Sequence, residues 1–253
     1  MEFHIFENFN IMMNKYYDYW TYIICMWSVF LLLLLYLRRF TMTKIYRIKC
    51  GNGNCYIISN GTNGVLVDTG KKEYITQVFK ACKDYNVKLI VLTHAHFDHA
   101  ENAAKISKEL GIPIGMNKND CNLIISNNNQ ALSATTIMGK IVLSASLRNF
   151  KSRSMLEFKP DVLLADGDDL YDYGINAKII ALPGHTNGSI GVDVDNKYLI
   201  VGDALMNMFY PTVSMLYNNK NEMIESARKI SRFEGRTIYF GHGKPVPNKQ
   251  WVK

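Results

Sequence analysis

The chain has few cysteines and no segment whose composition would prevent folding. Its 253 residues contain five cysteines, an odd number, and no two of them form a C-x-x-C pair. This argues against a disulfide framework and a thiolate zinc knuckle, and is typical of a reducing compartment. There is no long polar low-complexity tract and no repeat at the 20–50 residue scale. Because 48% of the residues are hydrophobic, we expect one large domain with a sizeable core, or one domain plus an appendage.

Acidic residues are outnumbered, and the excess positive charge lies in one part of the chain. The formal net charge is +7. Lys15, Arg38 and Arg39 balance the three acids of the first 41 residues, so all of the excess lies in residues 42–253. The lysines there are scattered, which favours a solvated surface over a nucleic-acid-binding face. The charge also favours an anionic small-molecule substrate, with a nucleic-acid role as the alternative.

Residues 19–37 contain no charged side chain and include the run Leu31–Leu35. As a helix this segment would reach about 30 Å, one hydrocarbon core. Arginines follow it and acids precede it, so the positive-inside rule predicts a transmembrane helix with the C-terminal domain in the cytoplasm. Translation from Met42 would instead give a soluble cytoplasmic protein, and a cleaved signal peptide is a third interpretation that the following Arg38-Arg39 pair disfavours. We therefore divide the chain into an N-terminal extension, residues 1–41, and a domain, residues 42–253.

Strand and helix patterns alternate through the second part of the chain. Apolar or alternating segments predict strands over 44–48, 55–59, 65–67, 89–92, 162–164, 178–182, 189–194, 198–201 and 237–240. Helices are predicted over about 73–85, 98–110 and 221–232. Residues 117–158 are predicted to be mostly helical, an insertion of the kind that forms a lid or substrate wall. Two strand-rich halves with helices between them suggest two packed sheets covered by helices.

Five of the six histidines stand at the end of an apolar strand or in the turn after it, where loops present side chains into clefts. A lone histidine is more often structural, but five in such places favour a metal site. In T-H-A-H-F-D-H, strand periodicity lets His94, His96 and Asp98 project to one side, while His99 begins the next helix. Such an array can hold two metal ions. Imidazole and carboxylate without thiolate favour Zn²⁺, with Fe or Mn as alternatives.

These residues resemble the metallo-β-lactamase superfamily. Residues 94–99 read H-A-H-F-D-H and match its H-x-H-x-D-H motif. Four further blocks follow the family's order over about residues 44–245: V-D-T-G at 67–70, P-G-H-T-N-G-S at 183–189, G-D-A at 202–204 and G-H-G at 241–243. The H-x-H-x-D-H motif alone is fairly specific for this superfamily, and five blocks in the family's order are very specific for it. The resemblance implies an α/β fold, the αββα sandwich, for residues 42–253, preceded by one N-terminal hydrophobic helix.

The resemblance also implies the ligands of two Zn²⁺ ions. Carried over onto matching positions, they are His94, His96 and His185 at site one, Asp98, His99 and His242 at site two, and Asp203 as the bridge. Asp68 would be a carboxylate that orients a ligand histidine.

The ligand set implies a hydrolytic mechanism. A hydroxide held between the metals would attack a carbonyl or phosphorus at neutral pH, because the metals lower the pKa of bound water. The catalytic residue would be Asp98, which ligates and orients the hydroxide. No G-x-S-x-G motif offers a serine nucleophile. Tyr210 or Tyr217 could donate a hydrogen bond to the oxyanion, although packing is the commoner role for such residues.

Differences from the patterns of known subfamilies narrow the range of possible substrate classes. The Asp203 block has no cysteine nearby, unlike the zinc β-lactamases with a cysteine ligand, and His96 stands where diiron flavoprotein oxidoreductases carry glutamate. The chain ends soon after His242, without the helical domain that holds glutathione in glyoxalase II enzymes. The first hypothesis is a glyoxalase II-like hydrolase of a thioester, ester or lactone. The alternatives are a phosphodiesterase or nuclease of the same fold, and a membrane-tethered metal-binding sensor with little turnover.

Overall fold

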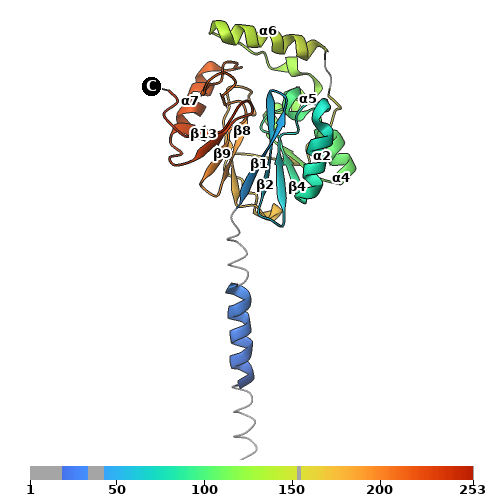
Figure 1. Ribbon diagram of the computed structural model, residues 1–253, viewed down its shortest axis with the longest axis vertical. Coiled ribbons are helices and arrows are strands. Elements are labelled where there is room, and N and C mark those ends of the chain that lie inside the picture. The colour runs from blue at the N-terminus through green and yellow to red at the C-terminus, as the bar shows by residue number, and fades with distance from the viewer. Residues whose placement is uncertain (1–18, 34–42, 153–154, 253) are drawn as a thin grey trace, which may run out of the picture. The chain divides into compact units, whose positions relative to one another are not determined.

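The computed structural model describes residues 19–33, 43–152 and 155–252 (Figure 1). The chain divides into two compact units, Met1–Met42 and Thr43–Lys253. In the first unit, residues 19–33 form a helix. The predicted transmembrane helix over 19–37 is not found: no helix among the described residues is long and apolar enough to cross a membrane. The described helix is shorter than the roughly 20 residues that a span requires, and residues 34–37 lie outside the described part.

Six strands form the first sheet of the second unit, in the order β1-β2-β3-β4-β5-β6. The first three are antiparallel neighbours, and β3 to β6 run parallel. β1 and β2 form a hairpin, with Lys49 opposite Asn54 and Cys50 opposite Gly53. The strands are β1 Lys44–Cys50, β2 Gly53–Ser59, β3 Gly64–Val67, β4 Val87–Val91, β5 Ile114–Met116 and β6 Val162–Leu163.

Five strands form the second sheet, in the order β13-β12-β9-β8-β7. Its neighbours are antiparallel except β12 and β9, which are parallel. A separate short ribbon pairs β10 with β11. The strands are β7 Ala177–Ala181, β8 Ile190–Val194, β9 Tyr198–Ile200, β10 Leu205–Met206, β11 Thr212–Val213, β12 Thr237–Tyr239 and β13 Val246–Pro247.

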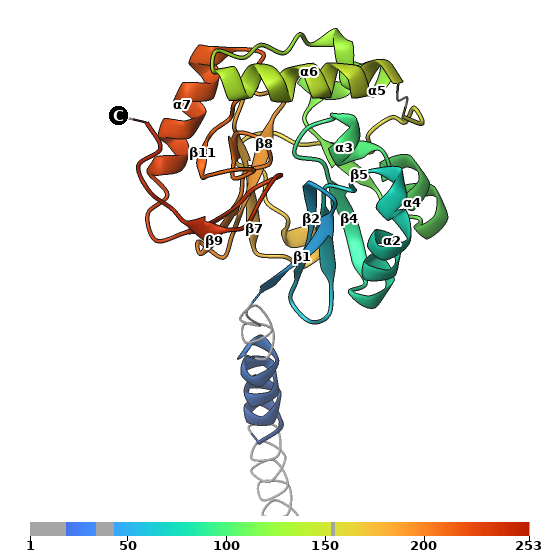
Figure 2. The ribbon, with the colours of Figure 1, turned by 45° about the horizontal axis from the view of Figure 1, so that its top comes forward.

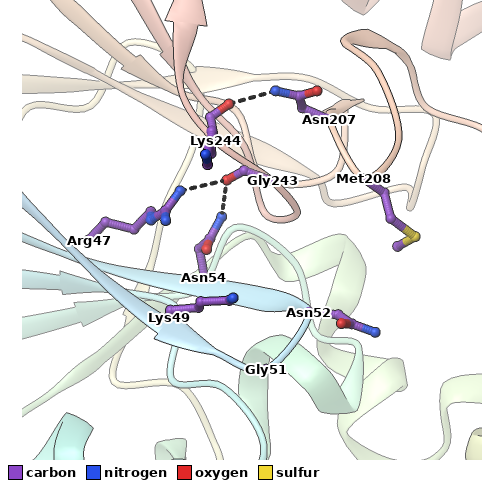
Figure 3. Close-up of a pocket in the computed structure, with 9 residues that line it drawn as sticks. All are labelled: Arg47, Lys49, Gly51, Asn52, Asn54, Asn207, Met208, Gly243 and Lys244. Atoms are coloured by element: carbon purple, nitrogen blue, oxygen red, sulfur yellow. Dashed lines mark hydrogen bonds between the residues drawn. The ribbon is translucent and has the colours of Figure 1, made fainter.

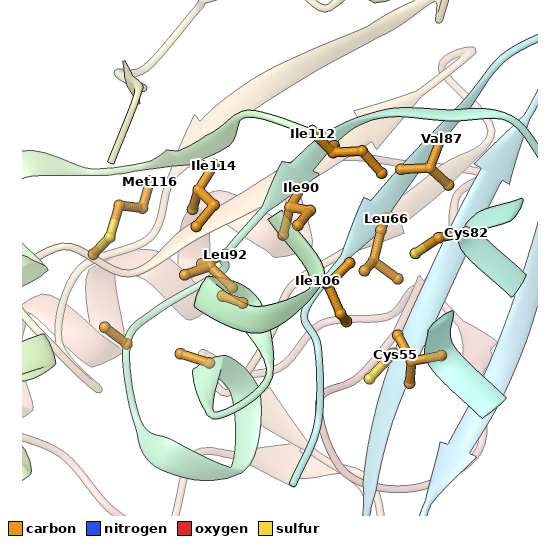
Figure 4. Packing of buried hydrophobic residues seen from close by; sticks show 14 of the residues in the cluster. Cys55, Leu66, Cys82, Val87, Ile90, Leu92, Ile106, Ile112, Ile114 and Met116 are labelled. Atoms are coloured by element: carbon orange, nitrogen blue, oxygen red, sulfur yellow. The ribbon is translucent and has the colours of Figure 1, made fainter. Parts of the chain in front are cut away.

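Alternating side chains on the central strands explain the layers. In β2, Ile58 belongs to a buried cluster shared with residues of the second sheet such as Val192, whereas Ile57 belongs to a cluster shared with Ile106 of α4 (Ala103–Leu110) and Cys82 of α2 (Ile75–Asp84). Figure 4 shows the second of these clusters. Because successive strand side chains point to opposite faces, one face of the first sheet packs on the second sheet and the other on helices.

The outer face of the second sheet is covered in the same way. Ala227 and Ile230 of α7 (Lys220–Ser231) pack with Leu199 of β9 and Ile238 of β12. Figure 2 shows α7 on one side of the paired sheets and α2 and α4 on the other. The order of layers is helix, sheet, sheet, helix, so the predicted αββα sandwich is confirmed.

The helices differ from the sequence prediction after β4. The predicted helix over 98–110 is two helices, α3 (Phe97–Ala100) and α4, with Asn102 between them. The Asn102 side chain donates to the carbonyl oxygens of residues 69–71, which ties the chain to the turn after β3. Residues 117–158 are mostly helical as predicted, and α6 lies across one end of the sandwich (Figure 2). The remaining helices are η1 Lys72–Tyr74, η2 Lys118–Asp120, α5 Cys121–Ile125, η3 Asn127–Asn129, α6 Ile137–Ser152 and η4 Tyr171–Tyr173.

Candidate metal centre

All seven predicted ligands come together, each from the segment that follows a strand. His94, His96, Asp98 and His99 follow β4, and the other three follow β7, β9 and β12. Their ligand atoms form three groups in which every atom lies within 4.8 Å of the others: His94, His96 and His185; His94, His99 and Asp203; and Asp98, His99 and His242. The first and third groups coincide with the two sites that the family resemblance implied.

Glycines let these turns approach one another. Gly202 has φ +53°, and a Cβ there would lie 2.6 Å from Thr93 Oγ1. Gly241 precedes the last histidine, and a Cβ there would lie 2.2 Å from Asp203 Oδ1 and 2.7 Å from His99 Cε1. Real Cβ contacts are essentially never this short. The motif glycines are therefore required by the close packing of backbone against the site.

Asp68 holds two parts of the site through one buried carboxylate. Its Oδ2 accepts a hydrogen bond from His99 Nδ1 at 2.8 Å and from Thr93 Oγ1 at 2.9 Å, and its Oδ1 accepts one from the Thr93 backbone N–H at 2.8 Å. Since the Thr93 hydroxyl donates to Asp68, it can accept from His94 Nδ1, which lies 3.1 Å away. Asp68 thus orients His99 directly and His94 through Thr93. The residue adopts φ +60°, an uncommon conformation for a non-glycine residue.

Backbone carbonyls orient two further histidines. His185 Nδ1 donates to the Leu216 carbonyl at 2.9 Å, and His242 Nδ1 donates to the Asn52 carbonyl at 2.9 Å. With Nδ1 occupied, each ring directs Nε2 toward the centre. Such outer hydrogen bonds fix the tautomer and the ring orientation of metal-binding histidines.

His96 is turned differently from the other four histidines. Its Nδ1 lies 3.1 Å from His185 Nε2, so Nδ1 is the atom that faces the centre. The ring packs against Phe150 of α6, with centroids 5.1 Å apart. A cation between these two nitrogens would satisfy both lone pairs.

Asp203 lies at the middle of the cluster. One of its carboxylate oxygens lies 3.3 Å from His242 Nε2 and 3.7 Å from His185 Nε2, and the other lies 3.6 Å from His99 Nε2. Asp98 Oδ2 lies 3.5 Å from His242 Nε2. Asp203 therefore contacts both outer groups, the position required of a ligand that bridges two ions.

Three ligand atoms of the cluster are buried without a hydrogen-bond partner: His94 Nε2, His99 Nε2 and Asp203 Oδ1. An unpaired buried polar atom costs about 1–3 kcal/mol, so three in one place call for a ligand. Imidazole nitrogens and carboxylate oxygens are suitable donors for Zn²⁺ or Fe. The residues present therefore fit a dinuclear metal centre.

The electrostatics of the cluster suit metal binding. Burial lowers the pKa of His96 to about 3, and burial together with the neighbouring His99 lowers the pKa of His94, so both are neutral imidazoles at pH 7. Burial opposes the charged form of Asp203, but His242 and His99 outweigh it and hold its pKa well below the usual range. Burial likewise opposes the charged form of His99, yet Asp68 and Asp203 raise its pKa to about 10. A metal ion would displace that proton.

A cavity of about 230 Å³ opens beside the cluster. His96, Asp98, His185, Asp203 and His242 line it on one side. The rest of the lining is largely apolar and comes mainly from α6, with Ile141, Val142, Ala145, Phe150, Leu132 and Leu216 among its residues. The helical insertion therefore supplies much of the cavity wall. Tyr210 and Tyr217 do not line this cavity, and Tyr210 is 57% exposed.

Asp120 supports the site and has no recognisable signal in the sequence. It is fully buried, and accepts hydrogen bonds from Thr186 Oγ1 and the Gly188 N–H, each at 2.7 Å, and from the Gln130 side chain. Burial raises its pKa. These bonds hold the loop that carries His185. The Asn52 and Leu216 carbonyls were also not predicted, because a backbone acceptor can belong to any residue type.

Comparisons with known proteins agree with this geometry. A family model described as "Metallo-beta-lactamase superfamily" matches residues 48–242. Hydroxyacylglutathione hydrolase GloC of Haemophilus influenzae is 31% identical over 167 residues, which are 64% of this chain and 71% of that protein.

Solved structures share the fold. The BLEG-1 B3 metallo-beta-lactamase has a TM-score of 0.64 at 20% identity, covering 83% of this chain and 95% of that chain. TTHA1623 in a di-iron-bound form has a TM-score of 0.53 at 17% identity, and the match covers 84% of this chain and 96% of that chain. Because the family model spans most of the sequence and the His/Asp cluster is complete, the chain belongs to the metallo-β-lactamase superfamily and is a metallo-hydrolase of that fold.

Proposed function

We propose that the protein hydrolyses a thioester, ester or lactone with two Zn²⁺ ions bound by the seven clustered residues. Site one would use His94, His96 and His185, site two would use Asp98, His99 and His242, and Asp203 would bridge them. The observation that carries this proposal is the set of buried, unpartnered ligand atoms around Asp203. Iron is the main alternative metal, since TTHA1623 holds a di-iron centre in the same fold.

The bound metals would supply an activated water at neutral pH and would polarise the substrate carbonyl. The protein's own contribution is positioning. Asp98 lines the cavity and lies beside His242, so its carboxylate can accept a hydrogen bond from the attacking water and orient the oxygen lone pair toward the carbonyl. Its pKa is lowered despite burial, because His99 and His242 outweigh the desolvation. The carboxylate is therefore ionised at neutral pH, as this role requires.

The shape of the cavity supports an acyl substrate. Its metal side offers the polar groups for the reacting carbonyl, and its α6 side offers Ile141, Val142 and Phe150 to an apolar chain. GloC, whose name states that it hydrolyses hydroxyacylglutathione, supports the thioester branch. A volume of about 230 Å³ suits a small molecule better than a polynucleotide.

Hydrolysis by the full-length, zinc-loaded protein tests the proposal. The panel would contain a glutathione thioester, an acyl-homoserine lactone, an aryl ester and an aryl phosphodiester, each also assayed with Asp98→Ala. We expect turnover of a carbonyl substrate that is lost in the variant. Turnover of the phosphodiester alone, with a steep loss of affinity in salt, would favour the nuclease alternative. Full activity in Asp98→Ala would contradict the role given to that carboxylate.

A further inference from the structure

A second pocket, of about 350 Å³, lies beside the metal centre and is lined by basic and amide side chains. Figure 3 shows Arg47 and Lys49 of β1 facing Gly243 and Lys244, the two residues that follow the last metal-binding histidine. Asn52, Asn54 and Asn207 complete the polar lining, together with Gly51 and Met208. No acidic residue is part of this lining.

The strand register explains why the cations share one face. Arg47 pairs with Tyr56 and Lys49 with Asn54 across the hairpin. Paired residues and alternate residues of a strand lie on the same face of a sheet. Asn54 donates to the Phe240 and Gly243 carbonyls and Tyr56 donates to the Phe240 carbonyl, so this face is turned toward the end of β12. The opposite face, with Ile57, belongs to the core against the helices.

The positive charge of this pocket is not neutralised within the described part of the chain. Arg47 donates one hydrogen bond, from Nη1 to the Gly243 carbonyl at 3.1 Å, and it forms no ion pair among the described residues. Lys49 and Lys244 are exposed and likewise have no carboxylate partner there. Three cations in a concave site, with the Asn52 side chain beside them, are suited to a carboxylate or a phosphate.

The pocket is joined to the metal centre by shared residues. Asn52 and Met208 line both cavities. The Asn52 carbonyl accepts the hydrogen bond from His242 Nδ1, and Gly243 and Lys244 follow His242 directly in the chain. One extended molecule can therefore lie across the metal centre and reach the basic pocket.

We propose that this pocket binds a carboxylate or phosphate carried by the leaving group of the substrate. The acyl part would lie against α6 and the anionic end between Arg47, Lys49 and Lys244. The substrate class is then an acyl thioester or ester with an anionic thiol or alcohol half. Assigning the anion to the leaving group rests on the hydrolysis proposed above, whereas anion binding by the pocket does not.

Uncleavable thioethers test the pocket without turnover. Calorimetry on the full-length zinc-loaded protein would compare S-hexylpantetheine with S-hexyl-4′-phosphopantetheine, and S-hexylglutathione with its diethyl ester. We expect the anion of at least one pair to bind about tenfold more tightly than its neutral or esterified counterpart, as is reasonable for partly exposed charge-assisted contacts. A preference in the first pair identifies phosphate, and one in the second pair identifies carboxylate. Equal affinity within both pairs, or no binding, would overturn the proposal.

Variants that remove positive charge test whether the lysines of this pocket cause the preference for the anionic ligand. The double variant Lys49→Gln/Lys244→Gln should reduce the preference for the anion to about twofold, and high salt should weaken it in the wild type. Lys88→Gln is the matched control, because Lys88 is also exposed but lies at the start of β4, away from the strand end that carries the ligands. An anion preference that survives in the double variant would contradict the proposal. Failure of every hydrolysis assay would count against the proposed reaction and leave this binding result intact.

Discussion

One added methyl group at Gly241 would disturb the metal centre directly. A Cβ at this position would lie 2.2 Å from Asp203 Oδ1, while ordinary contact begins at 3.4 Å. The carboxylate would therefore have to move by about 1 Å, whereas metal–ligand distances tolerate only about 0.2 Å. The backbone of Gly241 is outside the left-handed region, so the substitution adds a steric clash without backbone strain.

We expect Gly241→Ala to bind fewer than two metal ions and to lose more than about 100-fold in affinity, since loss of an outer partner alone costs about 10–100-fold. Metal analysis after dialysis and competition with a chelator measure both quantities. Gly53→Ala is the matched control, because its Cβ would lie 3.7 Å from the Asp98 carbonyl oxygen and 3.8 Å from His242 Cε1, which are ordinary contacts. Two ions held with wild-type affinity in a folded Gly241→Ala protein would refute this reasoning.

Three further outcomes follow from the same contacts. Asp68→Asn should weaken metal binding about 10–100-fold, because His99 loses the carboxylate that orients it; unchanged affinity in the chelator competition would count against that role. Asp120→Ala should lower the free energy of unfolding by about 3 kcal/mol, since three donors lose their acceptor at about 1 kcal/mol each. Denaturant unfolding measures this change, and a decrease of less than about 1 kcal/mol would contradict the supporting role given to Asp120. Chelation should lower the melting temperature and added Zn²⁺ should restore it, because a ligand that binds only the folded state stabilises it; equal melting temperatures would contradict a metal held by the folded site.

The sequence predicts those residues of the site that can be identified from their immediate neighbours in the chain. His94, His96, Asp98 and His99 lie within six consecutive positions after one strand, so the chain itself keeps them close together. Strand periodicity predicts His94, His96 and Asp98 on one side, but Asp98 lies in α3 and groups with His99 and His242. The family resemblance implied the roles of His185, Asp203 and His242, and each of them follows an apolar strand next to a glycine. The two-sheet fold was predictable for the same reason, since strands and helices leave periodic patterns.

The parts that the sequence does not predict depend on contacts between distant segments. His242 is oriented by the carbonyl of Asn52, 190 residues away, and His185 by that of Leu216, 31 residues away. A carbonyl acceptor carries no side-chain signature, so no motif could have indicated either partner. The division of one predicted helix into α3 and α4 has a similar origin, because Asn102 is held by the turn after β3. The basic pocket also joins residues 47–54 to 207–208 and 243–244.

Anomalous X-ray diffraction at the zinc edge, from crystals of the zinc-loaded protein, tests the central claim most directly. Two peaks are predicted, one among His94, His96 and His185 and one among Asp98, His99 and His242, with Asp203 in contact with both. A single peak, no peak, or peaks away from these residues would contradict the dinuclear centre on which the proposed hydrolysis depends.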